Sequence, residues 1–323
     1  MVIVFAYSAV VPKSSLHIQL TRIFFAMSLR ANIDKVLLKL AYLIISRNTP
    51  KLSKKFPKLV CFSFDYIGNY INTYGRYENA LLEKLREVVL RQGALDTVLD
   101  IGANIGNHTV FFSEIFKRVI AFEPNPRTFS LLSINTSNLQ NVSCLMLGAS
   151  SKKATLNFHV DELNMGDSRI SSENTPKEGD NHSITTIDVM PIDAIDEINS
   201  ENVSLVKIDV QGHEIEVIRG MLDTLRRTAP IIAFEQEAVE IVDGSSEVIK
   251  QLRDVGYSYF YTIEHRRSIV GNNLPSFLRV PFVLLEILIR GDNIDNAEFL
   301  EITSLEKRQY NMLIASMRHV ELK

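Results

Sequence analysis

The stretch Thr97-Val-Leu-Asp-Ile-Gly-Ala-Asn-Ile-Gly-Asn107 is a short apolar run that contains one acid and leads at once into two glycines four positions apart. The apolar run predicts a buried strand. A glycine directly after a strand allows a positive φ and lets a ligand approach without a Cβ in the way. The stretch therefore predicts a strand, a tight turn and a ligand site. It leaves open whether the ligand is a dinucleotide, a phosphate or a positively charged group.

Four further short apolar runs follow along the chain, at residues 118–123, 142–147, 204–210 and 230–236. Several of them are separated by patterns long enough for helices, such as the one that follows the Asn125-Pro126 start signal. We expect another helix from His213 to Thr228, after a turn at Gly212. Nearly continuous apolar strands alternating with helices predict an α/β fold with a mostly parallel sheet covered on both faces.

Residues 161–183 have no hydrophobic periodicity and follow a half-exposed strand expected at Thr155–Val160. A structureless loop of this length inside a compact domain is usually functional or disordered, and we interpret it as a lid on the acceptor side of a site.

Residues 1–58 form a helical, basic-ended extension ahead of a domain at residues 59–323. The first 15 residues have neither a basic leading region nor a clear cleavage site, so we do not expect a cleaved signal. Lysines and arginines interrupt the apolar pattern of residues 16–46, which predicts a helix pair packed on the core or a helix lying on a membrane surface.

The chain has 323 residues and a formal net charge of -3, so no overall positive field points to a nucleic-acid partner. Its two cysteines, Cys61 and Cys144, lack metal-ligand spacing, and we expect free thiols in a reducing compartment. The expected location is the cytoplasm, with peripheral membrane contact through residues 16–58 as an open alternative.

The strand ends are acidic. In an open parallel sheet the ligand sits beyond the carboxyl ends of the strands, near the point where the strand order reverses. Acids occur at or just after the ends of four of the five apolar runs: Asp100, Glu123, Asp209, and the pair Glu235 and Glu237. Such an edge suits hydroxyl and cationic groups better than an unshielded phosphate.

The glycine turn departs from the nicotinamide pattern G-x-G-x-x-G, because it reads G-A-N-I-G-N. Glu123 lies 21 residues beyond Gly102, where its carboxylate can accept hydrogen bonds from two ribose hydroxyls, as NAD or another adenosine ligand would require. Asp100, two residues before Gly102, disfavours a diphosphate and favours a ligand with an ammonium and a sulfonium. These charges point to S-adenosyl-L-methionine.

Three ordered blocks resemble the signature of the FkbM family of S-adenosylmethionine-dependent methyltransferases: DIGANIGNHT (100–109), FEPNP (122–126) and KIDVQGHE (207–214). Further matches are GRYE (75–78), NMGDS (164–168) and Gly220, so the resemblance spans about residues 70–305. Gln211 stands where the family pattern often has Glu. The resemblance implies O-methylation, frequently of a sugar or natural-product hydroxyl.

The resemblance also implies a class I methyltransferase (Rossmann-like) fold, a three-layer sandwich around a seven-stranded sheet with one antiparallel edge hairpin. Tyr257–Glu264 and Ala297–Ile302 are candidates for the hairpin, and the apolar stretch 278–290 between them is ambiguous.

The expected cofactor site combines the strand-end acids with the turn. Asp100 would hold the methionine ammonium, Glu123 the ribose, and Gly102 and Gly106 would allow close backbone approach. Asn104, Asn107 and His108 would bond the amino-acid part of the cofactor or cap the helix at 107–117. The remaining expected cofactor contacts are Pro124 and Asn125.

The expected catalytic residues are Lys207, on the run at 204–210, and Asp209, His213 and Glu235, at strand exits. An alcohol acceptor has to lose its proton, and Asp209, His213, Glu214 and Glu235 are candidate bases. No dedicated metal site is expected, although an ion bridging Asp209 and Glu235 stays open. Two functional alternatives also stay open: an NAD-dependent dehydrogenase, and a non-catalytic protein that binds S-adenosylmethionine.

Overall fold

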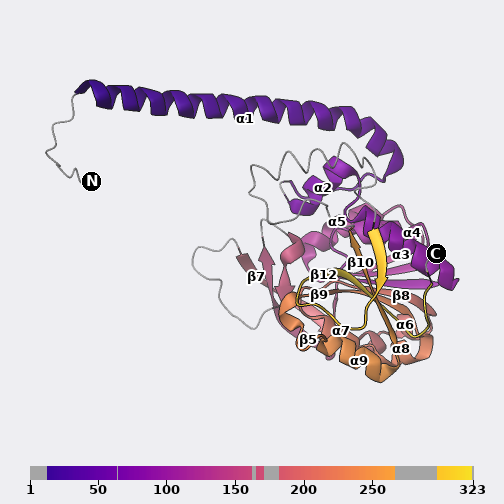
Figure 1. Ribbon diagram of the computed structural model, residues 1–323. Helices are drawn as coiled ribbons and strands as arrows, with labels where there is room; N and C mark the ends of the chain where they lie inside the picture. The colour runs from indigo at the N-terminus through magenta and orange to yellow at the C-terminus, as the bar shows by residue number, and fades with distance from the viewer. Residues whose placement is uncertain (1–12, 64, 162–164, 171–181, 266–296, 322–323) are drawn as a thin grey trace. The chain divides into compact units, whose positions relative to one another are not determined.

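A computed structural model describes residues 13–63, 65–161, 165–170, 182–265 and 297–321. The chain divides into two units, Met1–Phe56 and Pro57–Lys323. The described residues of the first unit form one helix, α1 (Lys13–Lys55), in place of the helix pair that was one alternative (Figure 1). Residues 13–49 contain neither Gly nor Pro, so nothing in the backbone interrupts the helix over this range, and the one proline of α1, Pro50, lies near its C-terminal end. Within the described residues, no helix combines the length and apolar character needed to cross a membrane.

The second unit is built on an eight-stranded sheet with the order β11-β10-β12-β9-β8-β1-β2-β3. Its parallel part comprises the five expected runs: β1 (Thr97–Ile101), β2 (Arg118–Phe122), β3 (Val142–Leu145), β8 (Val203–Ile208) and β9 (Ile231–Gln236). The strand order reverses at β1, which has β2 on one side and β8 on the other. The α/β fold and the parallel strands are therefore as the sequence predicts.

The C-terminal edge differs in detail from the expectation. The expected hairpin forms between β10 (Tyr259–His265) and β11 (Ala297–Glu301), which pair antiparallel. A strand that the sequence reading missed, β12 (Tyr310–Ser316), lies between β9 and β10 and is antiparallel to both. The described sheet thus has eight strands rather than seven, and the stretch 278–290 lies outside the described residues.

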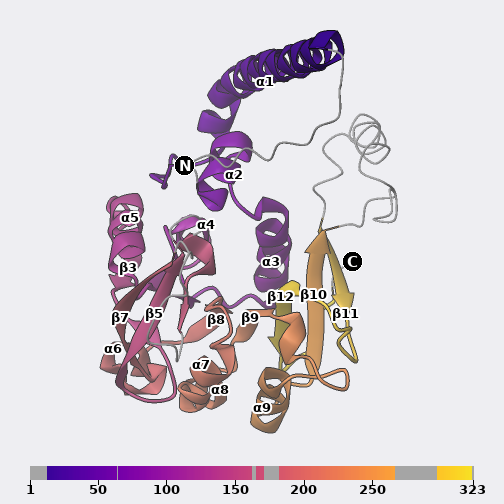
Figure 2. The same cartoon turned by 90° about the vertical axis from the view of Figure 1, so that its left-hand side faces the viewer.

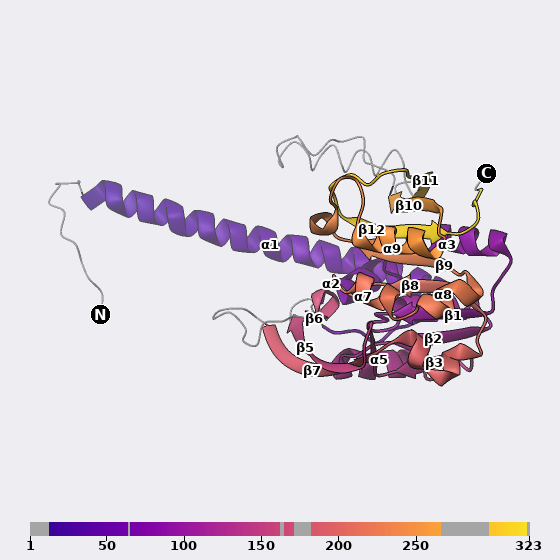
Figure 3. The same cartoon turned by 90° about the horizontal axis from the view of Figure 1, so that it is seen from below.

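A smaller sheet, ordered β4-β7-β5-β6, lies at the other end from β10 to β12 (Figure 2). Its strands are β4 (Gly148–Ala149), β5 (Ala154–Asp161), β6 (Arg169–Ile170) and β7 (His182–Met190). The long β5 and β7 form a curved antiparallel pair (Figure 3) that packs Phe158 and Val160 with Ile187 and Val189.

The β5 strand confirms the alternation at Thr155–Val160, but the expected structureless loop is wrong for the described part of 161–183. That part contains the 3-10 turn η1 (Met165–Asp167), β6 and the start of β7. Residues 162–164 and 171–181 of the expected lid lie outside the described residues. The first residues of β7 are ordered because they pair with β5 across the sheet. Pairing between distant segments of this kind leaves no periodic pattern in the local sequence.

Helices cover both faces of the main sheet. On one face, α3 (Asn79–Gln92) and α4 (Asn107–Ser113) pack leucines and phenylalanines against Val98 and Leu205. On the other, α7 (Glu214–Arg219), α8 (Leu222–Thr228) and α9 (Glu247–Val255) pack against Leu99 and Val206. Neighbouring strand residues point to opposite faces, which gives the expected three layers. The other helical segments are α2 (Tyr66–Tyr74), α5 (Pro126–Thr136), α6 (Asp196–Asn199), η2 (Ile192–Ala194) and η3 (Ala238–Glu240).

The helix start predicted at Asn125 and the helix predicted over residues 213–228 have different outcomes. Asn125 caps α5 as expected, with its Oδ1 accepting a hydrogen bond from the Arg127 backbone N–H at 3.1 Å. The single helix expected over residues 213–228 is wrong, because it breaks into α7 and α8 at Gly220. A Cβ on Gly220 would lie 2.0 Å from the Ser150 carbonyl oxygen. The break therefore lies where the helix backbone meets the segment after β4.

Candidate active site

A pocket opens at the carboxyl ends of β1, β2, β8 and β9, where the strand order reverses. Phe158 and Ile187 from the small sheet form part of its wall. Eleven of the thirteen expected site residues line it: Gly102, Asn104, Asn107, His108, Glu123, Pro124, Asn125, Lys207, Asp209, His213 and Glu235. The two others, Asp100 and Gly106, are not part of its lining.

Close packing explains why the turn has glycine at positions 102 and 106. Gly102 has φ of 82°, and a Cβ there would lie 1.8 Å from the Asp209 carbonyl oxygen. Gly106 has φ of 91° and begins α4, where a Cβ would lie 2.9 Å from Leu132 Cδ1. Gly102 thus lets the turn approach the exit of β8. Gly106 serves the packing of α4 on α5 instead of lining the pocket.

Glu123 is held as a two-sided acceptor at the end of β2. Its Oε2 accepts a hydrogen bond from the Asn104 N–H and its Oε1 one from the Asn125 N–H, both at 2.9 Å. The residue is only 6% exposed, and burial raises the pKa of Glu123 to about 7 although both N–H groups act in the opposite direction. Each carboxylate oxygen can still accept a second hydrogen bond, so a pair of ribose hydroxyls fits this group.

Asp100 lies behind the pocket wall. It is fully buried, and its Oδ2 accepts a hydrogen bond from Thr109 Oγ1 at 2.6 Å. Its Oδ1 has no hydrogen-bond partner among the described residues and lies 3.9 Å from Lys207 Nζ. Asp100 and Lys207 are cross-strand partners on β1 and β8. The carboxylate therefore faces the lysine that supports the catalytic side of the pocket.

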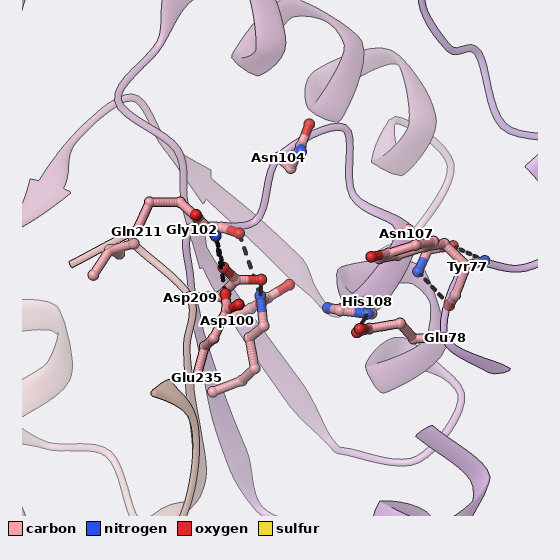
Figure 4. Close-up of polar contacts among 12 residues, drawn as sticks. Tyr77, Glu78, Asp100, Gly102, Asn104, Asn107, His108, Asp209, Gln211 and Glu235 are labelled. Carbon is pink, nitrogen blue, oxygen red and sulfur yellow. Dashed lines mark hydrogen bonds and ion pairs between the residues drawn. The ribbon is translucent and has the colours of Figure 1, made fainter. Parts of the chain in front are cut away.

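Asp209 and Glu235 form a carboxylate pair beside Gln211 (Figure 4), and amide side chains and a lysine hold the pair. Gln211 Nε2 donates to Asp209 Oδ1 at 3.1 Å and to Glu235 Oε2 at 2.9 Å. Lys207 Nζ donates to Asp209 Oδ2 at 3.0 Å, and Gln309 Nε2 donates to Glu235 Oε1 at 2.7 Å. Gln211 adopts a left-handed backbone with φ of 54°, which carries its amide between the two acids. Gln at this position therefore supplies a donor that a Glu would lack.

The two acids, Asp209 and Glu235, have pKa values shifted in opposite directions. Burial alone would raise the pKa of Asp209, but the neighbouring Lys207 ammonium outweighs it and lowers that pKa. Burial and the negative charge of Asp209 raise the pKa of Glu235 to about 8. Burial lowers the pKa of Lys207, yet Asp209 and Asp100 reverse the effect and raise it overall. At neutral pH, Asp209 and Lys207 are charged and Glu235 is largely protonated.

The other two candidate bases differ in position. His213 lines the pocket with its Nε2 3.0 Å from Ser150 Oγ, and burial lowers its pKa below 6.5. Glu214 is 2% exposed and is not part of the pocket lining. Its two oxygens accept the backbone N–H groups of Val210 and Gly212. Glu214 therefore holds the loop after β8, and the geometry leaves His213 and Glu235 as the stronger candidates for a base.

The pocket lining includes residues that the sequence reading did not assign to the site, among them Tyr66, Tyr77, Glu78, Gln309 and Asn311. Two of them belong to the GRYE block, whose match to the family was the available signal. Gln309 and Asn311 lie at the start of the unpredicted β12, and no local pattern marked them.

The strand order with its antiparallel β12, and the pocket beyond β1 and β8, define a class I methyltransferase fold. Residues 100–259 match the methyltransferase FkbM domain, so the chain carries a domain of the FkbM methyltransferase family. This assignment supports S-adenosyl-L-methionine as the cofactor and favours a methyltransferase over the dehydrogenase alternative.

Two curated relatives match parts of the chain. The hexuronic acid methyltransferase AglP of Haloferax volcanii is 33% identical over 158 residues, which cover 48% of this chain and 63% of the relative. Methyltransferase 1 of Beauveria bassiana is 31% identical over 145 residues, which cover 39% of this chain and 58% of the relative. The matches thus span less than two thirds of either relative.

Among solved structures, the methyltransferase FkbM of Methylobacillus flagellatus KT is 17% identical, with a TM-score of 0.36. That match covers 69% of this chain and 56% of the other.

Proposed function

We propose that this protein transfers the methyl group of S-adenosyl-L-methionine to a hydroxyl group on a sugar, glycan or natural-product acceptor. The observation that carries the proposal is the shared pocket: the two-sided acceptor Glu123 and the acid pair Asp209 and Glu235 line one cavity. A cofactor anchor and a candidate base for an alcohol are thereby combined. The hexuronic acid methyltransferase among the relatives supports a sugar acceptor.

The residues present fit the cofactor. Glu123 would bind the ribose hydroxyls, and the backbone of the turn from Gly102 to Ile105 would lie along the cofactor without a side chain at the first glycine. Once bound, the cofactor supplies an electrophilic methyl group. Holding the acceptor oxygen in line with that methyl group is the main task of the protein, and orientation of this kind lowers a barrier by about 7 to 11 kcal/mol at best.

We assign the role of general base to Glu235. An acid whose pKa is raised toward 8 is a stronger base, once ionised, than an ordinary carboxylate. Gln211 and Gln309 fix its two oxygens, and Asp209 keeps its own charge beside Lys207. Glu235 would accept the hydroxyl proton of the acceptor, while His213 is the competing assignment.

Two measurements test the proposed function. S-adenosylhomocysteine should raise the thermal unfolding temperature of the protein, and NADH should not; the reverse result would reject the cofactor. Incubation with S-adenosylmethionine labelled in the methyl group and a cell-envelope sugar extract should then label a sugar product. Binding without label transfer to any hydroxyl-bearing acceptor would favour the non-catalytic alternative.

For α1 we propose contact with a membrane surface. Large apolar side chains are exposed on this helix between Ile33 and Ile45, and residues 32–55 contain six basic residues and one acid. Apolar side chains next to lysines suit an anionic bilayer surface. The protein should sediment with vesicles containing phosphatidylserine. A variant with Leu37, Leu40 and Ile44 changed to Gln should not, whereas equal sedimentation of both proteins, or self-association that the variant abolishes, would contradict the proposal.

A further inference from the structure

Glu78 occupies an unusual place at the pocket. It precedes α3 with a left-handed backbone, φ of 54°, and its side chain does not cap the helix. A non-glycine residue in this conformation is unfavourable and persists only where its surroundings impose it. The side chain is 13% exposed and lines the pocket. The backbone is thus held in a costly conformation that carries a carboxylate into the pocket.

Residues 76–78 each contact α4 or Glu114, the residue that directly follows α4. Arg76 pairs with Glu114 at 2.9 Å. The Asn107 side chain accepts the Tyr77 N–H at 3.1 Å and donates to the Tyr77 carbonyl oxygen at 3.0 Å.

Glu78 Oε2 lies 3.4 Å from His108 Nε2 on the first turn of α4 (Figure 4). Segment 76–78 therefore places the Glu78 carboxylate beside the end of the glycine turn.

The other pocket acids are already engaged. Glu123 accepts two backbone N–H groups at the end of β2, and Asp209 and Glu235 share Gln211. Within the described part of the chain, the Glu78 carboxylate accepts no hydrogen bond from a backbone N–H, and its ion-pair partner is His108 at 3.4 Å. Glu78 lines the same pocket as Lys207, and its negative charge contributes to the raised pKa of that lysine. A carboxylate in this position has free acceptor capacity for a cation.

We propose that Glu78, rather than Asp100, directly binds the methionine ammonium of S-adenosylmethionine. Asp100 is fully buried behind the wall, whereas Glu78 lines the pocket beside the α4 turn. This inference rests on the proposed cofactor. Residue 78 lies outside the segment 100–259 that matches the family domain. Its role therefore follows from the contacts of residues 76–78.

The test compares two ligands by calorimetry. S-adenosylhomocysteine carries the ammonium, and 5'-methylthioadenosine has the same nucleoside without the amino-acid part. Glu78→Gln should weaken binding of S-adenosylhomocysteine by about 10- to 100-fold, the range of a charge-assisted hydrogen bond. Binding of 5'-methylthioadenosine should stay within about twofold and also report that the variant is folded.

Glu87→Gln is the matched control, because Glu87 is an exposed acid on α3, the helix that Glu78 precedes, and is paired only with Lys84 in the described structure. Asp100→Asn should not change the affinity ratio of the two ligands selectively. Equal loss of both ligands in Glu78→Gln, or no loss of either, would overturn the role of Glu78. If the unaltered protein bound neither ligand, the proposed cofactor itself would be wrong.

Discussion

Replacing Asp209 by Asn should shift the pH dependence of methyl transfer to lower pH. Both acids lie close to Gln211 Nε2, Asp209 Oδ1 at 3.1 Å and Glu235 Oε2 at 2.9 Å, so these two oxygens are at most 6.0 Å apart. At an effective dielectric constant of about 20, two charges at that distance repel by about 2.8 kcal/mol, or about two pK units. Without the Asp209 charge, the pKa of Glu235 should fall from about 8 toward about 6.

The sign follows from the role of the base. Glu235 accepts a proton only when ionised, so the rate should rise with pH through its pKa. At pH 7, about a tenth of the molecules have an ionised Glu235 in the unaltered protein, and about nine tenths should in Asp209→Asn. Whatever its absolute rate, the variant should react at pH 7 at a rate much closer to its own plateau.

The assay measures the transfer of labelled methyl groups between pH 5.5 and 9.5 at saturating cofactor, whose charge acts on both proteins alike. Asp243→Asn is the control, since Asp243 is an exposed acid that does not line the pocket, and its profile should match the unaltered protein. A rising limb at the same pH in Asp209→Asn would refute the coupling. If the rate instead rose with pH below pH 6.5, and this rise disappeared in His213→Gln, the base would be His213.

Three further changes test other parts of the site. Glu123→Ala should weaken S-adenosylhomocysteine about 100-fold by calorimetry, because two charge-assisted acceptors are lost, and unchanged affinity would refute the ribose anchor. Gly102→Ala should lower the free energy of unfolding in urea by more than about 3 kcal/mol, because its Cβ would meet the Asp209 carbonyl, whereas Gly93→Ala, with open space around its Cβ, should cost only about 1 kcal/mol; equal costs would disprove the close approach. Asp65→Ala should cost about 1 to 2 kcal/mol and speed hydrogen exchange at the start of α2, since Asp65 accepts N–H groups from both α2 and η1; unchanged exchange would show that this bridge is weak.

The parallel strands and most of the pocket could be predicted from the sequence, because both depend on local patterns. A buried parallel strand is apolar over its whole length, and its carboxyl end leads directly to the ligand. Glu123, Asp209 and Glu235 could therefore be placed in one pocket, because each lies at the carboxyl end of one of three apolar runs. The ladder between β1 and β8 then brings Asp209 beside the glycine turn, as the contact of Gly102 with the Asp209 carbonyl shows.

The missed parts depend on pairing between distant segments. The small sheet needs β7 to meet β5, and β12 needs partners on two sides, so neither appears in a local window. Gln309 reaches Glu235 across 74 positions of the sequence, and segment 76–78 reaches α4 across about 30. Such contacts decide which acid faces the pocket, and periodicity alone does not report them.

The position of Asp100 shows why a charge in a motif need not touch the ligand. Its side chain shares a sheet face with the cross-strand partner Lys207 and hydrogen-bonds Thr109 from α4, so the carboxylate is buried between the strand and the helix above it. From there it helps to raise the pKa of Lys207, and Lys207 keeps Asp209 ionised. Asp209 in turn raises the pKa of Glu235. The first acid of the motif thus acts on the proposed base through two intervening charges, and the proposed contact with a cationic ligand is made by Glu78.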